Sequence, residues 1–285
     1  MTRKRNVFLG EINITMHPHS AEKYAAMWES MVRLRKPVIY RGNWGVVLQS
    51  SIKELVDDRL VYAGVIAKFM VIDQTLDWYN VNTFEEASAG EIQNINVPDH
   101  LKPNLSTFRY IFLPSTHKLI FESKSGNKIL NPNALAKVLT VLVSSPDIDA
   151  EYGRIDVNTI KDERALEKIL RMPMLQKLRI KVDRPNDDDI GSFDEDFMRE
   201  LDRQNVQRVE YDYTAERGES IKPDEQVLKI AELANRYGHV DAVGKDSNGA
   251  KLVESTKEHP KRVAYIMDPK IEDVGQVLKR SVTGR

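Results

Sequence analysis

The stretch Phe108-Arg109-Tyr110-Ile111-Phe112-Leu113-Pro114-Ser115-Thr116-His117-Lys118-Leu119-Ile120-Phe121-Glu122 determines how the first half of this chain is interpreted. Two runs rich in aromatic and branched aliphatic residues, 108–113 and 117–122, are separated by a short Pro-Ser-Thr segment. Runs of this composition on either side of turn-forming residues are typical of a β-hairpin. The stretch therefore predicts two antiparallel strands. A helix over 133–143 is expected to follow, because Pro132 suits a first helical turn.

The residues before the hairpin predict one more strand, one helix and a second strand pair. Residues 7–16 alternate between apolar and polar side chains, which is the two-residue period of a strand. Apolar side chains at three- and four-residue spacing predict a helix over 21–35, with Ser20 as its N-cap. The runs 38–48 and 60–72 predict another antiparallel pair.

From residue 150 onward the chain alternates strand-like and helix-like segments. Its strands are half polar, since Leu178 and Ile180 alternate with lysine and arginine. A parallel sheet covered on both faces has nearly continuous apolar strands, so this pattern favours helices mainly on one face. We predict an α+β fold with mixed or antiparallel sheets in two α/β lobes. The expected N-terminal domain spans 1–149 and the C-terminal domain spans 150–285.

The composition limits the kinds of protein that this chain can be. With 41% hydrophobic and 30% charged residues among 285, it is typical of a globular protein. Its apolar runs fall well short of the roughly 20 residues of a membrane-spanning helix. The lack of cysteine excludes disulfides, zinc–thiolate sites and thiol nucleophiles. We therefore expect a cytoplasmic protein without a membrane partner.

Asp99, Glu122 and Lys124 are the candidate catalytic residues. Metal-dependent nucleases of the PD-(D/E)xK type use two carboxylates to hold Mg²⁺ and a lysine to activate the attacking water. Glu122 and Lys124 are expected to share one face of the second hairpin strand, but Asp99 precedes the hairpin in a proline-bounded segment. The alternative interpretation is a cross-strand ion pair beside a turn.

Two groups of cations are candidates for contact with nucleic acid. Such a ligand must be met by a local patch, because the formal net charge of the chain is only -1. The predicted contact residues are Arg33, Arg35, Lys36 and Arg41 near the first helix, and Lys177, Arg179 and Lys181 along one strand. The second group could equally be neutralised by a neighbouring strand, 206–213, which carries acidic residues on its polar face.

Other motifs favour structural interpretations. The segment His17-Pro18-His19 is more typical of a turn than of a metal site. The acidic run 187–196 lacks the spacing of a calcium-binding loop. Glycine-rich phosphate loops and the G-x-S-x-G motif are absent from the sequence. We predict no metal site and no cofactor, with Mg²⁺ required only under the nuclease alternative.

The sequence also resembles a known family. The segment 108–122, the Asn131-Pro132 pair with the helix after it, the run Leu178-Arg179-Ile180-Lys181-Val182 and the Asn248-Gly249 turn resemble the uncharacterised bacterial family DUF4747. That family is similar in layout to phage-exclusion and phage-defence proteins, including the RexA protein of phage lambda and the B component of the Kiwa system. The resemblance implies an intracellular, dimer-forming protein that binds nucleic acid, and it implies no catalytic residues.

The function that we expect follows from these observations together. The leading hypothesis is a non-enzymatic protein that binds or senses DNA or RNA in bacterial anti-phage defence. It is expected to act as a homodimer, with a partner protein of the same defence operon supplying any chemistry. The alternatives are the Mg²⁺-dependent nuclease and a protein–protein scaffold subunit.

Overall fold

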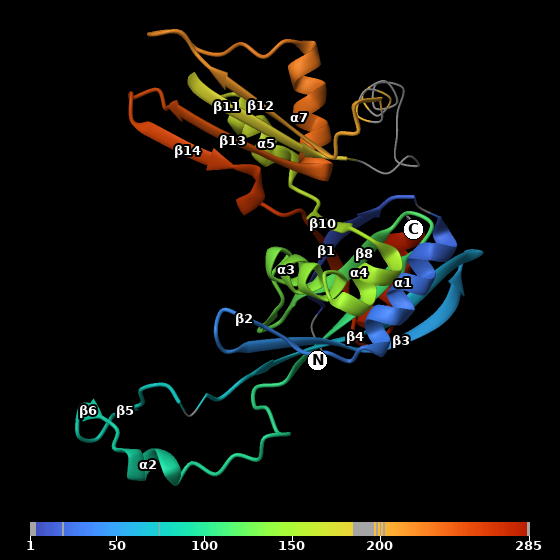
Figure 1. Ribbon diagram of the computed structural model, residues 1–285, viewed down its shortest axis with the longest axis vertical. Helices are drawn as coiled ribbons and strands as arrows, with labels where there is room; N and C mark the ends of the chain where they lie inside the picture. The colour runs from blue at the N-terminus through green and yellow to red at the C-terminus, as the bar shows by residue number, and fades with distance from the viewer. Residues whose placement is uncertain are drawn as a thin grey trace.

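The computed structural model describes residues 4–18, 20–73, 75–184, 197, 199, 201 and 203–283. These residues form an α+β fold with a central body, an upper lobe and an arm (Figure 1). The body contains a large antiparallel sheet, the upper lobe contains a four-stranded antiparallel sheet, and the arm is the excursion 71–105. The predicted fold class is confirmed.

The large sheet is arranged around strand β1 (Arg5–Met16). Its other strands are β2 (Val38–Tyr40), β3 (Trp44–Val56), β4 (Arg59–Met70), β7 (Ser106–Leu113), β8 (Lys118–Ser125), β9 (Lys128–Ile129), β10 (Ile155–Thr159) and β15 (Arg262–Met267). Their order is β10-β1-β8-β7-β4-β3-β2, with β15 also paired to β1 and β9 paired to β8. The two predicted strand pairs are confirmed as β7–β8 and β3–β4.

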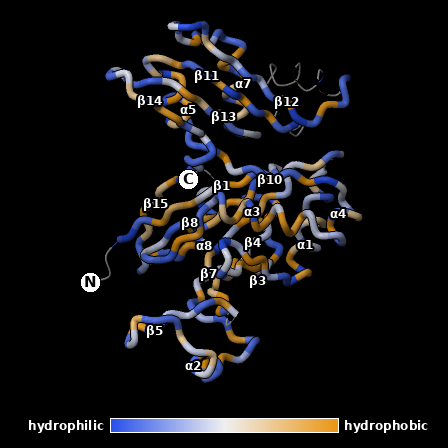
Figure 2. Tube along the Cα trace, turned by 60° about the vertical axis from the view of Figure 1, so that its left-hand side comes forward, coloured by the Kyte–Doolittle hydropathy of each residue, from blue (hydrophilic) through white to orange (hydrophobic). Residues whose placement is uncertain are grey.

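Helices cover the two faces of the large sheet unequally. Helices α1 (Ala21–Arg33), α3 (Pro132–Val143) and α4 (Pro146–Tyr152) share one core with it, and Figure 2 shows hydrophobic residues where they meet the strands. Helix α8 (Val274–Thr283) packs a smaller core against the opposite face. No helix in the described ranges is both long and apolar enough to cross a membrane.

The upper lobe has its helices on one face of a second sheet. The strands β12 (Arg208–Thr214), β11 (Met174–Asp183), β13 (Gly238–Lys245) and β14 (Lys251–Ser255) pair in that order. Helices α5 (Glu163–Leu170) and α7 (Glu225–Tyr237) share the core of this lobe. Its opposite face carries the polar side chains of β11, as the alternation predicts. Most of the helix-like run 193–204, for which the sequence predicts a helix, lies outside the described residues, and the acidic run 187–196 lies wholly outside them.

The chain crosses between body and upper lobe twice, at adjacent places. It enters the lobe at 160–162 and returns at 259–261 after the 3₁₀ turn η2 (Thr256–Glu258). The two crossings form a β-bridge between Lys161 and Pro260. Because β10 and β15 both pair with β1, the large sheet includes strands from either side of the upper lobe. The large sheet therefore contains strands from both sides of residue 150. The division into domains at 149/150 stays a prediction.

The arm contains short elements without a core. It consists of β5 (Tyr79–Asn80), β6 (Glu85–Glu86) and α2 (Ala89–Gln93), joined by irregular segments, as the sequence predicts. A capping box between Ser88 and Glu91 begins α2. None of the described residues of the arm is buried. Five large apolar side chains of the arm are at least 60% exposed: Leu76, Tyr79, Val81, Phe84 and Leu105.

Trp28 holds α1 on the large sheet, and its removal provides a test of this packing. The indole is fully buried, stacks on Phe112 at 4.4 Å between ring centroids and meets Tyr110 edge-on at 5.4 Å. We expect Trp28→Ala to lower the free energy of unfolding by about 3–5 kcal/mol, because a large cavity is left in a packed core. In the control Ile52→Ala the side chain is 69% exposed, and a change within about 0.5 kcal/mol is expected. Equal losses in urea denaturation would contradict this role.

Candidate functional site

Glu122 is buried on the α8 side of the large sheet. Its side chain is 5% exposed, and its Oε2 accepts a hydrogen bond from the backbone N–H of Arg109 at 3.2 Å. It lines a cavity of about 340 Å³ together with Ser125 and residues at the start of α8. A buried carboxylate in a cavity is what the nuclease hypothesis requires of this residue.

Lys124 does not share the face of Glu122, and the expectation that it would is wrong. On β1, Leu9 pairs with Glu122 and Phe8 pairs with Lys124, so Ser123 is an extra residue in β8. Successive residues of β1 point to opposite faces, and paired residues share a face. Lys124 therefore points away from Glu122, and its Nζ lies over the ring of Phe8, 5.7 Å from the ring centroid.

Asp99 lies apart from both residues. It lines a cavity of about 380 Å³ at the base of the arm, with Lys102 and Asp73 among its neighbours. That cavity shares no lining residue with the one beside Glu122. Within the described part of the chain, no three acidic or histidine side chains are grouped so that they could hold a metal ion. The three nuclease candidates are thus not brought together.

The basic strand of the upper lobe is largely neutralised by its neighbour. Arg179 forms an ion pair with Asp212, with 2.6 Å between Nη2 and Oδ2, and Lys181 pairs with Glu210 at 3.2 Å. Lys177 stands opposite Thr214. The pairing of β11 with β12 places these acidic residues opposite the cations. This is the alternative given above, in which a neighbouring strand neutralises the basic strand.

The cations near the first helix are divided between two places. Arg33, Arg35 and Lys36 are exposed at the end of α1 and in the segment that follows it. Arg41, in the turn between β2 and β3, instead lines a cavity between the body and the upper lobe. Of the four predicted contact residues in this group, only Arg41 lines the cavity between the body and the upper lobe.

The cavity between the body and the upper lobe has a volume of about 470 Å³. The body contributes residues of α3 and β10, and the upper lobe contributes β11, β12, β13 and η2. The charged and histidine residues that line it are Arg41, Lys137, Lys161, Lys181, Asp183, Arg208, His239, Lys257 and Glu258. Six of these are lysine or arginine and two are acidic, so the cavity is strongly cationic. We call it the cationic cavity.

Lys161 is the buried residue of the cationic cavity. It lies in the first crossing and is 3% exposed. Its backbone N–H donates to the carbonyl of Asn235, and the Asn235 amide donates to the carbonyl of Lys161, both at 3.3 Å. These bonds fix the backbone against the end of α7, while the side chain lines the cavity. The pKa of its ammonium is lowered to about 8, mainly by burial; Asp183 opposes this shift and Lys257 adds to it.

Four cations of the cavity have no carboxylate within ion-pair distance among the described residues: Arg41, Lys137, Lys161 and Lys257. The others are paired: Lys181 with Glu210, Arg208 with Asp183, and His239 with Asp241. A buried charge without a partner is costly, and native proteins keep such groups mainly where a ligand or reaction uses them. The arrangement fits an anionic ligand that completes the missing pairs.

Sequence reasoning missed Lys137, Lys161 and Lys257. They come from α3, the first crossing and η2, and nothing in their local sequence separates them from the other lysines of the chain. The available signal is that Lys161 lies two residues beyond the end of β10 at Thr159, in the short connection that leads to α5 of the upper lobe. Only the tertiary arrangement brings the three ammonium groups to one cavity.

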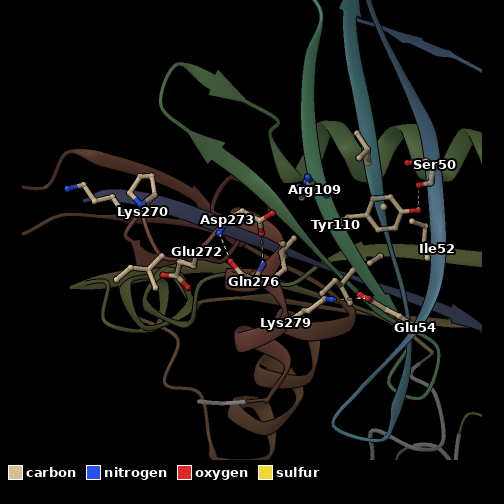
Figure 3. A pocket seen from close by; sticks show the side chains of 18 residues that line it. Ser50, Ile52, Glu54, Arg109, Tyr110, Lys270, Glu272, Asp273, Gln276 and Lys279 are labelled. Atoms are coloured by element: carbon tan, nitrogen blue, oxygen red, sulfur yellow. Dashed lines mark hydrogen bonds and ion pairs between the residues drawn. The ribbon is translucent and has the colours of Figure 1, made fainter. Parts of the chain in front are cut away.

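A larger cavity, of about 570 Å³, lies between β3, β4, β7 and the start of α8 (Figure 3). Its charges are mostly compensated. Lys279 pairs with Glu54 at 2.8 Å, and Asp273 caps α8 by accepting from the backbone of Gln276. The hydroxyl of Tyr110 donates to the carbonyl of Ser50 at 2.9 Å. Figure 3 shows these contacts and leaves Arg109 and Lys270 without a drawn partner. Among the described residues, the cationic cavity has twice as many unpaired cations, one of them buried, and is the better candidate for an anionic ligand.

Replacing Lys161 by an apolar residue tests whether its charge is kept at the expense of stability. Its pKa lies below the ordinary 10.5, so at neutral pH the folded protein bears the full cost of the buried ammonium. We expect Lys161→Met to unfold at higher urea concentration, with a gain of about 3 kcal/mol at pH 7. The gain should shrink as the pH rises from 8 toward 10.5, where the folded wild type loses its proton before the unfolded chain does.

The control for this comparison is Lys137→Met. Lys137 is exposed on α3, so the substitution should leave the free energy of unfolding within about 0.5 kcal/mol of the wild type at every pH. A Lys161→Met variant that is less stable than the wild type at pH 7 would show that the ammonium is a structural partner instead.

Comparison with known proteins places this chain in a family. No curated protein matches it. The model of one protein family, described as a domain of unknown function, matches residues 5–283 and so covers the body, the arm and the upper lobe. The resemblance that the hairpin and the later segments indicated is therefore supported over nearly the whole chain. The chain belongs to the DUF4747 family.

Proposed function

We propose that this protein binds nucleic acid, DNA or RNA, through the cationic cavity. The observation that carries the proposal is the set of four cations without carboxylate partners in the described structure, one of which, Lys161, is buried. Phosphate groups are the anions that such a set of lysine and arginine side chains most commonly meets in nucleic-acid-binding proteins.

A polymer fits the distribution of charge better than a single small anion. Lys161 is buried, whereas Arg41, Lys137 and Lys257 are exposed around it. An extended ligand can meet the exposed cations with successive phosphates and place one group near Lys161. The contacts are with the backbone of the polymer, so we propose binding with little dependence on sequence.

The biological setting is part of the same proposal. The resemblance stated above implies a sensing role in bacterial anti-phage defence, in the cytoplasm, as a homodimer with a partner protein of the same operon. In this proposal the cations contact the phosphates directly, without a metal or a cofactor. The protein would therefore recognise the nucleic acid, and the partner would act on it.

A protein–protein scaffold is the second candidate function, and the arm favours it. Within 71–105 the sequence has six acidic residues and a single lysine, Lys102. Large apolar side chains are exposed on the same excursion, among them Phe84 at 76%. Exposed apolar groups beside acidic ones suit a protein surface and disfavour a nucleic acid. We assign the arm to a protein partner and the cationic cavity to the polymer.

Salt-dependent binding tests the proposal. Fluorescence anisotropy with labelled single-stranded and duplex DNA and RNA should show affinity that falls steeply as the KCl concentration rises. The double variant Lys137→Gln/Lys257→Gln should bind more weakly and lower the slope of log K against log salt by about two phosphate contacts, roughly 0.9 each on duplex DNA. Lys177→Gln, an exposed lysine outside the cavity, is the matched control and should bind like the wild type.

Two outcomes would overturn the proposal. One is the lack of binding to any of these polymers even at low salt. The other is an equal loss of affinity in Lys177→Gln and in the double variant, because this would place the contacts outside the cationic cavity.

A further inference from the structure

Lys161 has the surroundings of a nucleophilic amine. The carboxylate of Asp183, on β11, favours the protonated form of Lys161. This carboxylate already forms an ion pair with Arg208 of β12. From η2, Lys257 lies close enough to disfavour a second positive charge. From β13, His239 is engaged by Asp241. No hydrogen bond or ion pair to the Lys161 ammonium is formed within the described structure.

Burial and a neighbouring cation are the two conditions that activate lysine for attack on a carbonyl carbon. Because the pKa of Lys161 is lowered to about 8, roughly a tenth of the chains carry the neutral amine at pH 7. The cavity of about 470 Å³ is of the size that admits a small molecule or a single extruded nucleotide. The cations Arg41, Lys137 and Lys257 line the same cavity and can bind a phosphate group of the same ligand.

We propose that Lys161 forms an imine with a phosphorylated aldehyde bound in the cationic cavity. The inference rests on the proposed function, because the same cations hold the phosphate. Two sources share this chemistry: a free phosphorylated aldehyde, and an abasic site in nucleic acid, whose open sugar presents an aldehyde between two phosphates.

The reaction balances without an oxidant or reductant. The lone pair of Nζ forms a bond to the carbonyl carbon, and the π electrons of the carbonyl move to its oxygen, which takes up a proton. The resulting carbinolamine loses this oxygen as water while the nitrogen gives up its remaining proton, so that amine and aldehyde become imine and water. Asp183 stabilises the protonated imine, since its carboxylate is the acidic group that acts on Lys161.

Reductive trapping on the full-length chain tests the inference. One experiment uses pyridoxal phosphate as the probe, and a second experiment uses an oligonucleotide with one abasic site. Each is incubated with the protein and reduced with borohydride, which turns the imine into a stable secondary amine. Intact mass and peptide mapping then locate the label. We expect it on Lys161, with a yield that rises as the pH passes through about 8 and falls when pyrophosphate competes for the cations.

Matched variants distinguish a specific imine from random labelling. Lys161→Arg keeps the charge and cannot form an imine, so the yield should fall about tenfold or more. Lys161→Met provides a second test if the arginine does not fit, and circular dichroism confirms that each variant is folded. Lys177→Arg should be labelled like the wild type. Labels spread over exposed lysines and unchanged in both Lys161 variants would overturn the inference.

The two proposals fail in different ways. Wild-type protein that binds intact oligonucleotides in a salt-dependent manner but is trapped by neither probe refutes the imine and leaves nucleic-acid binding in place. Trapping of pyridoxal phosphate on Lys161 without binding to any polymer supports the imine with the free aldehyde and refutes the nucleic-acid ligand. Trapping of the abasic oligonucleotide on Lys161 supports both.

Discussion

The pairing of β1 along both of its edges is the constraint on which the rest of the structure depends. One edge pairs with β8. The other is shared end to end: β15 pairs with Arg5–Gly10 and β10 pairs with Ile12–Met16. The two strands that lead to and from the upper lobe therefore meet near Glu11. Its carbonyl accepts from the N–H of Ile160, and its carboxylate pairs with Lys261 at 3.6 Å.

This arrangement explains why a cation is buried at the boundary between the lobe and the body. Both crossings must leave the large sheet at the same point, and residue 161 lies between the sheet and α7. A lysine there loses hydration without gaining a carboxylate partner in ion-pair contact. An apolar side chain would suit the position better for stability, and it is on this ground that we propose a ligand for the lysine. The same strand topology that joins the two lobes therefore also buries the lysine of the candidate site.

Most of the fold was predictable because it is determined by local patterns. Alternation identified β1, β7 and β8, and the helical spacing around Trp28 identified α1. The placement of β15 was not predictable, because a strand far along the chain returns to pair with β1. The expected face of Lys124 was wrong for a related reason. The extra residue Ser123 reverses the alternation, and no feature of the local sequence marks this bulge.

The site was less predictable than the fold, because its charges are brought together only by tertiary structure. The cations of β11 form an evident run in the sequence, but the acidic residues of a paired strand readily neutralise such a run, as the ion pair of Arg179 with Asp212 shows. The unpaired cations of the cavity are instead scattered singly along the chain, at four separate places: Arg41, Lys137, Lys161 and Lys257. Among the predicted contact residues, Arg41 lines the cavity without a partner and Lys181 lines it in an ion pair.

The near-neutral charge of the chain conceals two regions of opposite sign. The arm, 71–105, contributes an excess of acidic residues, so the remainder of the chain carries a net positive charge. The total of -1 is therefore a poor guide to what either part binds. If the cationic cavity binds a polyanion, as we propose, the acidic arm would repel that ligand from the exposed apolar side chains and leave them for another partner. Separation of charge along the molecule allows one chain to present two surfaces that do not compete for the same partner.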